Sequence, residues 1–274
     1  MSERSSVVAS RVPRDDKRDD RAVGTQAIRR ALAVLELFRD TRTDLGNTQI
    51  ANALGLRPST THRIVRALVD EGYLTQNAEN ERYYLSRGAV LLGLAAQRSL
   101  GLSAALPVLE RISASTSESV NLGVSDGTHA LVVLRAESPL PLRFDQPPGT
   151  RVPLHASSMG KALLAFGGDV EEYVESLGGG LPSYTPHTVT SVPALRKEIE
   201  VTRDRGYSLD DEESITGVRC VGAPIINAQG RARAAAAIQA PSVRLPDARI
   251  DKLAEEIVTA AAEISDLLPP DHEF

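Results

Sequence analysis

Apolar side chains in the first hundred residues recur at helical spacing in three segments. The first begins at Gln26, and one stripe along it holds Ile28, Leu32, Leu35 and Phe38. The second covers 47–54 and stops at Gly55. The third runs from Ser59, which we expect to be its N-cap, to about Glu71. The pattern therefore predicts three consecutive helices.

Two short β-prone segments follow, at 73–76 and 82–85, and the residues between them predict a hairpin. Three helices and a hairpin, with a tight glycine-containing turn between the second and third helices, are typical of an all-α winged helix-turn-helix domain with a small wing. Residues 88–100 are apolar with a helical period, which predicts a linker helix.

Beyond residue 101, helical and strand patterns alternate. Strands are expected on both sides of the turns at 126–127 and 227–230. Helices are predicted near 102–115, 157–166, 192–205 and 246–268. Antiparallel hairpins among flanking helices predict an α+β domain in which helices cover the sheet.

Charge divides along the chain in the same way. The whole chain has a formal charge of -5. Residues 1–100 hold 16 Lys and Arg against 12 Asp and Glu, a charge of +4, and residues 101–274 hold 15 against 24, a charge of -9. We expect a disordered leader at 1–24, a DNA-binding domain at 25–87, a linker helix at 88–101 and a ligand-binding domain at 102–270.

Composition excludes several classes of protein. The single cysteine, Cys220, has no partner for a disulfide within the chain. No apolar run approaches the roughly 20 residues that span a bilayer, and the charged N-terminus lacks the apolar stretch of a signal peptide. We expect a cytoplasmic protein without membrane association, and we identify no residue set for a cofactor or a metal.

The third predicted helix carries polar and basic side chains at its N-terminal end, as a recognition helix in the major groove requires. Each residue taken alone could be an ordinary exposed helix residue, so the prediction rests on their combination with the short helices and the wing. The candidate DNA contacts are Arg57, Ser59, Thr60, Thr61, His62, Arg63, Arg66 and, on the wing, Arg82.

Three stretches together resemble the IclR family of bacterial transcriptional regulators. The winged-helix motif is NTQIANALGLRPSTTHRIVRALVDEGYL. Two later motifs, VPLHASSMGKALLAF and RGYSLDDEESITGVRCVGAPI, are similar to the family's effector-binding domain. The resemblance covers about 26–268 and implies a GAF-like C-terminal domain, dimers or tetramers, and palindromic operator DNA as partner.

The resemblance also implies an effector site in the second domain. The backbone amides of Ser158 and Met159 match the ligand-anchoring positions, and helix-start amides can hold a carboxylate. Ordinary capping by Ser157 explains the same residues equally well. Asp210 and Cys220 match pocket-lining positions, although Cys220 could be a buried core thiol.

This chain departs from the small-acid binders of the family. Ala237 and Gln239 stand where those members carry two serines, and the Ser158–Met159 pair replaces a smaller Gly-Ala pair. We therefore expect a larger or aromatic acid rather than one of the size of glyoxylate or pyruvate. An ionised Asp210 would repel its carboxylate, so Asp210 is expected to accept from a ligand hydroxyl or to be protonated. The acidic run 210–213 otherwise reads as a solvated turn.

The patterns predict a DNA-binding protein with a second domain, and the resemblance implies a repressor that binds palindromic operator DNA as an oligomer and responds to a small organic acid. A constitutive DNA binder without an effector is the alternative. A hydrolase that uses His155 and Ser157 is a third hypothesis, but no nucleophile-elbow, zinc or paired-cysteine motif supports it.

Overall fold

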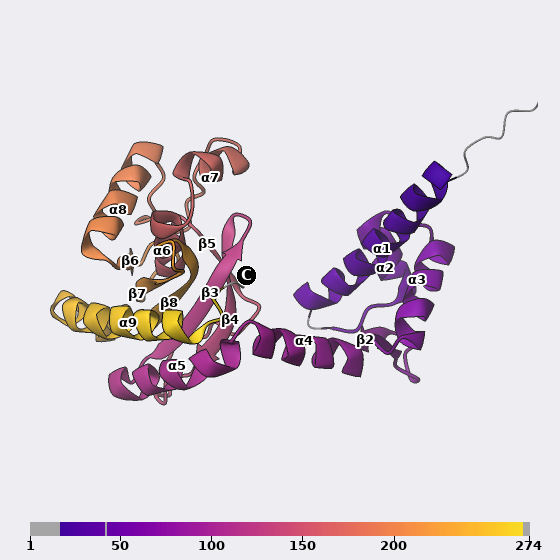
Figure 1. Ribbon diagram of the computed structural model, residues 1–274, viewed down its shortest axis with the longest axis horizontal. Helices are drawn as coiled ribbons and strands as arrows, with labels where there is room; N and C mark the ends of the chain where they lie inside the picture. Colours follow the sequence, from indigo (N-terminus) through magenta and orange to yellow (C-terminus); the bar gives the residue numbers. More distant parts are fainter. Residues whose placement is uncertain (1–16, 42, 271–274) are drawn as a thin grey trace, which may run out of the picture. The chain divides into compact units, whose positions relative to one another are not determined.

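The computed structural model describes residues 17–41 and 43–270, with side chains from Thr25 onward except Asp40. The chain divides between Gly93 and Leu94 into two compact units. Figure 1 shows both units, and each is described by itself. The division falls inside helix α4 (Arg87–Ser99).

The first unit is a three-helix domain with a two-stranded wing (Figure 1). Its elements are α1 (Lys17–Asp40), α2 (Asn47–Leu54), α3 (Pro58–Asp70), β1 (Leu74–Gln76) and β2 (Tyr83–Leu85). Gly55 ends α2 in the left-handed conformation, with φ of 62°, so a residue with a side chain would be strained there. Val34, Ile50, Val65 and Leu74 meet in the core.

The expected start of α1 was wrong. The helix begins at Lys17, so residues 17–24 of the predicted leader are helical, while 1–16 lie outside the described residues. Extending a formed helix costs little compared with nucleating one, which is why its start was placed too late. Ile28 and Leu32 are exposed, because the core of this unit reaches only the second half of α1, at Val34 and Phe38.

The second unit is built on a six-stranded antiparallel sheet with the order β5-β4-β3-β8-β7-β6. The strands are β3 (Ser119–Asp126), β4 (His129–Ala136), β5 (Arg151–Pro153), β6 (Ser208–Asp211), β7 (Val218–Ile226) and β8 (Ala232–Pro241). The helices are α5 (Leu102–Thr116), α6 (Ser158–Phe166), α7 (Val170–Ser176), α8 (Val192–Arg205) and α9 (Asp247–Leu267). A 3-10 turn, η1, covers Ser242–Arg244.

Helices cover both faces of this sheet (Figure 1). One face, with Leu122 and Ile238, packs against α5 and α9. The other face, with Ala235 and Ala237, packs against α6 and α8. The strand alternation sends neighbouring side chains to opposite layers, so the α+β class expected from the sequence is confirmed. The pattern missed the short β5, β6 and α7.

Helices α4 and α5 follow each other in the sequence where the first unit passes into the second, and they differ in burial. No side chain of α4 is buried, whereas α5 contributes Leu109 and Ile112 to the core. Among the described residues no single helix has the length and apolar character to cross a bilayer, although the bent pair of α4 and α5 meets both limits together.

Candidate functional sites

The first candidate site is the solvent-facing side of α3. Arg57 is the N-cap residue and Pro58 occupies the first helical position, where its fixed φ suits a helix start. Ser59 therefore lies inside the helix, and its prediction as the N-cap was wrong. The cap Arg57 makes no side-chain hydrogen bond to the helix, so its guanidinium is not used in capping.

Most of the predicted DNA contacts lie on this exposed side. Ser59, His62, Arg63 and Arg66 are exposed, and Thr60 is half-buried. Arg82, on the wing, donates a hydrogen bond to the backbone oxygen of Asp44 (3.3 Å), which connects the wing to the segment between α1 and α2. The opposite face of α3 packs into the core through Val65 and Leu68.

Thr61 is the exception among the predicted contacts. Its side chain is fully buried, and its hydroxyl has no hydrogen-bond partner. Residues at helical spacing from Thr61, namely Val65 and Leu68, form the packed face of α3, so Thr61 points inward with them. The inclusion of Thr61 among the base contacts was wrong.

The second candidate site lies where α6 begins. Ser157 caps the helix by accepting a hydrogen bond from the Gly160 amide (3.1 Å). This cap leaves the amides of Ser158 and Met159, the first two of the helix, without an intrahelical acceptor. The interpretation as a cap and the interpretation as an anion site are therefore compatible, because the cap uses a different amide.

Close packing holds the start of α6 against the sheet. A Cβ on Gly222 of β7 would lie 3.0 Å from the Ser158 carbonyl carbon, and one on Gly123 of β3 would lie 3.0 Å from the Met159 sulfur. Ser208 of β6 donates a hydrogen bond to the Ser158 carbonyl (2.6 Å). At Gly222 the close contact is with the backbone of the helix, so a side chain there would push α6 away from the sheet.

All six residues predicted for the effector site lie on this side of the sheet. Gln239 pairs with Cys220 across β8 and β7, and Cys220 pairs with Asp210 across β7 and β6. Ala237 pairs with Gly222, beneath Ser158. The row formed by Asp210, Cys220 and Gln239 is two residues along the strands from the pair of Gly222 and Ala237, against which α6 begins. The structure therefore brings the predicted residues together near the amides of Ser158 and Met159.

Asp210 has a structural role that the sequence did not indicate. Its carboxylate accepts hydrogen bonds from the Glu213 amide (2.8 Å), the Ser214 amide (3.3 Å) and the Ser214 hydroxyl (2.6 Å), and so closes the turn after β6. Burial raises the pKa of Asp210, against the lowering by these hydrogen bonds. The interpretation of 210–213 as a solvated turn was wrong for Asp210 and Glu213, which are both buried.

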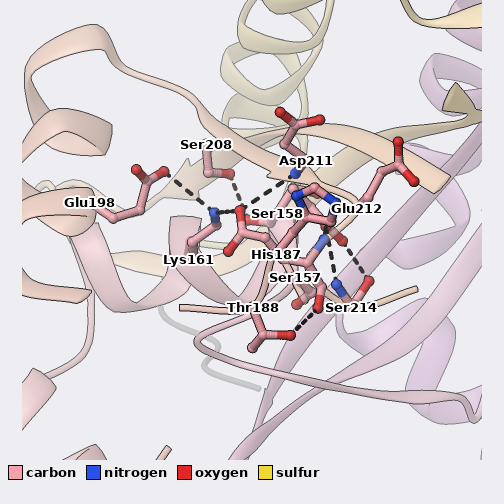
Figure 2. A network of polar contacts seen from close by, with 12 residues as sticks. Ser157, Ser158, Lys161, His187, Thr188, Glu198, Ser208, Asp211, Glu212 and Ser214 are labelled. Carbon is pink, nitrogen blue, oxygen red and sulfur yellow. Dashed lines mark hydrogen bonds and ion pairs between the residues drawn. The ribbon is translucent and has the colours of Figure 1, made fainter. Parts of the chain in front are cut away.

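Cys220 and Lys161 also lie near the start of α6. Burial raises the pKa of the Cys220 thiol well above its usual value, so the thiol is neutral and serves as a small apolar wall. Lys161 is fully buried and pairs with Glu213 (2.5 Å) and Glu198 (3.4 Å). Figure 2 shows Lys161 and Ser158 beside the acidic turn.

Sequence reasoning missed Lys161 as part of this site. A single cation inside the otherwise apolar helix SMGKALLAF was the available signal, because a buried lysine requires a carboxylate partner. It also missed Asn121, an amide within the apolar run VNLGV of β3.

The residues of the hydrolase hypothesis do not meet. The Ser157 hydroxyl donates to the Pro153 carbonyl (2.7 Å). The ring of His155 contacts the Tyr173 hydroxyl through Nδ1 (2.6 Å) and the Pro182 carbonyl through Nε2 (2.9 Å). Burial lowers the pKa of His155 and raises that of Tyr173 to about 12, so neutral His155 donates from Nε2 and accepts from Tyr173. A serine activated by histidine is absent here.

The fold and these two sites define a two-domain DNA-binding regulator with a sensor domain. Residues 27–78 match the IclR helix-turn-helix domain, and residues 95–266 match the C-terminal domain of bacterial IclR transcriptional regulators. The chain belongs to the IclR family, as the sequence resemblance predicted, and the family comprises transcriptional regulators and not enzymes.

Curated relatives share most of their length with this chain. The HTH-type transcriptional regulator BhcR of Paracoccus denitrificans is 36% identical over 245 residues, covering 88% of this chain and 87% of that protein. The transcriptional repressor IclR of Escherichia coli K12 is 32% identical over 245 residues, covering 88% and 89%.

Solved structures show the same arrangement of elements. An IclR homologue from Microbacterium hydrocarbonoxydans, crystallised with 4-hydroxybenzoate, is 28% identical with a TM-score of 0.76, covering 88% of this chain and 98% of that one. An IclR-type regulator from Alicyclobacillus acidocaldarius has a TM-score of 0.80 at 23% identity, covering 88% and 98%, and supports the fold alone. The function of this protein is thus DNA-binding regulation of transcription.

Proposed function

We propose that this regulator is a cytoplasmic repressor whose operator affinity is controlled by a small organic acid bound at the start of α6. The observation that carries the effector site is the pair of helix-start amides at Ser158 and Met159, held over the sheet by glycine contacts at Gly222 and Gly123. Such amides, with the helix dipole, stabilise a carboxylate. The 4-hydroxybenzoate complex of a homologue supports an acid as the ligand.

The DNA step uses the exposed side of α3. We assign base-edge and phosphate contacts to the exposed or half-buried members of the predicted set, which are Arg57, Ser59, Thr60, His62, Arg63, Arg66 and Arg82. Arginine can pair with guanine in the major groove, and serine and threonine hydroxyls can donate to or accept from base edges.

Exposed apolar side chains support a homodimer or a homotetramer. Four of them lie on α4 and two on α1: Val90, Leu91, Leu92, Leu94, Ile28 and Leu32. An oligomer would cover them and would place two α3 helices on the half-sites of a palindrome, about 34 Å apart. Light scattering of the full chain across concentrations tests this: a monomer at all concentrations would contradict it.

Substitution of Ser158 by proline tests the carboxylate anchor. Proline at the first helical position removes one amide donor and keeps the helix. The preceding Ser157 has φ of -111° and ψ of 149°, which a following proline allows. Ser158→Ala is the matched control, since it removes the hydroxyl and keeps the amide.

Calorimetry of full-length protein with a panel of aliphatic and aromatic acids gives the readout. We expect at least one acid to bind wild type and Ser158→Ala, and to bind Ser158→Pro at least tenfold more weakly, about 1.4 kcal/mol. Equal binding by both variants would reject the anchor. If no acid of the panel binds the wild type, the result rejects the proposed site for these acids and favours the alternative, a constitutive DNA binder without an effector.

A further inference from the structure

Three side-chain amides form a buried cluster at one end of the predicted effector residues. Asn121 of β3 donates from Nδ2 to the backbone oxygen of Gln146 (3.2 Å) and to Oε1 of Gln239 (3.2 Å). Gln239 donates from Nε2 to Oε1 of Gln146 (2.5 Å). The three residues are 0%, 6% and 3% exposed, so water does not reach them freely.

One acceptor in this cluster is unsatisfied. Oδ1 of Asn121 is buried and has no hydrogen-bond partner. The orientation of the amide is set by its neighbours, because the Gln146 backbone oxygen and Gln239 Oε1 can only accept and must face Nδ2. A buried polar atom without a partner is unfavourable, and native proteins keep few of them. A group that binds Oδ1 therefore has to be a donor.

Strand register places this acceptor beside the start of α6. Asn121 pairs with Ala237, and Ala237 pairs with Gly222, which lies against Ser158. Two residues along β3 from Asn121, and on the same face, Gly123 lies against Met159. Asn121 is two strands from Gly222, or about 10 Å across the sheet. That span is comparable to the length of a benzoate with a para substituent.

We propose that Asn121, oriented by Gln146 and Gln239, is a second anchor of the effector site and selects organic acids that carry a hydroxyl or amino group about one aromatic ring away from the carboxylate. The carboxylate lies at the amides of Ser158 and Met159, and the donor group lies at Asn121 Oδ1. The inference rests on the proposed function, because it requires the acid to bind at the start of α6.

This arrangement gives a role to Gln239, which stands where the small-acid binders of the family carry a serine. A glutamine there has both a donor and an acceptor, and both are used to hold Asn121 and Gln146 in place. Gln239 is thus a positioning residue, and the free acceptor is on the neighbouring strand. A site built to hydrogen-bond a ligand hydroxyl discriminates strongly against the analogue that lacks it.

The probes are 4-hydroxybenzoate, 4-aminobenzoate and benzoate, measured by calorimetry with full-length protein. We expect wild type to bind the two donor-bearing acids at least tenfold more tightly than benzoate. Asn121→Ala should reduce this preference to less than threefold and leave benzoate affinity within threefold of wild type. Gln229→Ala, which removes an exposed amide on the β7–β8 turn, is the control and should keep the full preference.

Equal binding of benzoate and 4-hydroxybenzoate by wild type would overturn the inference, as would an undiminished preference in Asn121→Ala. If Asn121→Ala does not fold, a crystal structure of wild type with 4-hydroxybenzoate decides: the hydroxyl oxygen should lie within hydrogen-bond distance of Asn121 Oδ1, and any other position rejects the proposal. If the benzoates fail to bind while another acid binds and responds to Ser158→Pro, the inference fails and the proposed function stands. If no acid binds, both fail.

Discussion

Lys161 and Glu213 form a buried ion pair that joins the first turns of α6 to the turn after β6, with Nζ and Oε1 2.5 Å apart. Both side chains are excluded from solvent, and Glu198 lies 3.4 Å from the same ammonium. Thr188 donates a hydrogen bond to the Glu213 backbone oxygen (2.6 Å), which brings a third segment to this point (Figure 2). The pair therefore fixes the geometry around the proposed carboxylate anchor.

Removing the cation should destabilise the second unit strongly. Lys161→Met leaves Glu213 buried without its main partner, and breaking a buried pair from one side costs about 3–5 kcal/mol. The double variant Lys161→Met/Glu213→Leu should recover part of this loss, because no uncompensated charge remains. Urea unfolding measures both, with Lys197→Met on the exposed side of α8 as control. A loss below about 1 kcal/mol in the single variant would show that the pair is not important for stability.

Gly160 is the position where the helix comes closest to the chain before it. A Cβ there would lie 2.4 Å from the Leu154 Cα, so Gly160→Ala must displace α6 or the 154–157 segment. Alanine inside a helix ordinarily gains about 0.5–1 kcal/mol over glycine. We expect a loss of about 2 kcal/mol or more instead, as for other overpacked positions.

Gly93 provides the matched control for that substitution. It also lies in a helix, α4, and a Cβ there would meet nothing within 4 Å. Thermal unfolding should show Gly93→Ala unchanged or slightly stabilised and Gly160→Ala destabilised. A gain in stability for Gly160→Ala would contradict the packing described for α6.

The buried His155 should make stability depend on pH. Its pKa is lowered in the folded protein from 6.5, chiefly by burial, so the unfolded chain binds more protons in this range. The contribution is present above the unfolded pKa and is lost as pH falls from about 6.5 through the lower folded value. Urea unfolding at pH 7, 6 and 5 should show a steeper loss in wild type than in His155→Gln. Parallel curves would contradict the neutral buried histidine.

Variants at exposed and at buried positions of α3 test which side of this helix contacts DNA. Arg63→Ala and Arg66→Ala should each weaken binding to the protein's own upstream DNA, and a lost phosphate contact should lower the salt slope by about 1. Lys252→Ala, an exposed residue of α9, removes the same charge and should have little effect. Thr61→Val, at a buried position, should leave DNA affinity unchanged. Loss of binding in Thr61→Val alone would reverse the assignment of the two faces.

The sequence predicted the elements that depend on local patterns better than those that depend on contacts. Helix α8, Val192–Arg205, was predicted with these limits, because Ser191 caps it and Gly206 ends it in the left-handed conformation. The three-residue β5 and four-residue β6 were missed, since so short a strand is defined by its neighbour and hardly by its own pattern.

The candidate effector site also has a part that the sequence predicted and a part that only contacts in the fold define. The resemblance predicted that Asp210, Cys220 and Gln239 line the effector site. The strand register places them side by side, and their role in binding stays a prediction. The amide cluster of Asn121 and Gln146 joins residues 25 positions apart through a loop and a strand. No local pattern predicts which isolated amides meet in a fold, so this part required the structure.

The proposed function requires that acid binding in the second unit changes the DNA affinity of the first, and one titration measures this coupling. A labelled fragment of the upstream DNA is bound to the full-length protein, and fluorescence anisotropy follows its affinity as the acid found by calorimetry is added. Coupling between sites typically amounts to about 1–3 kcal/mol, so saturating acid should change the DNA dissociation constant by about 5- to 150-fold in wild type and not in Ser158→Pro. An unchanged DNA affinity in wild type, at an acid concentration that saturates the second unit, would rule out control of the operator affinity by this acid.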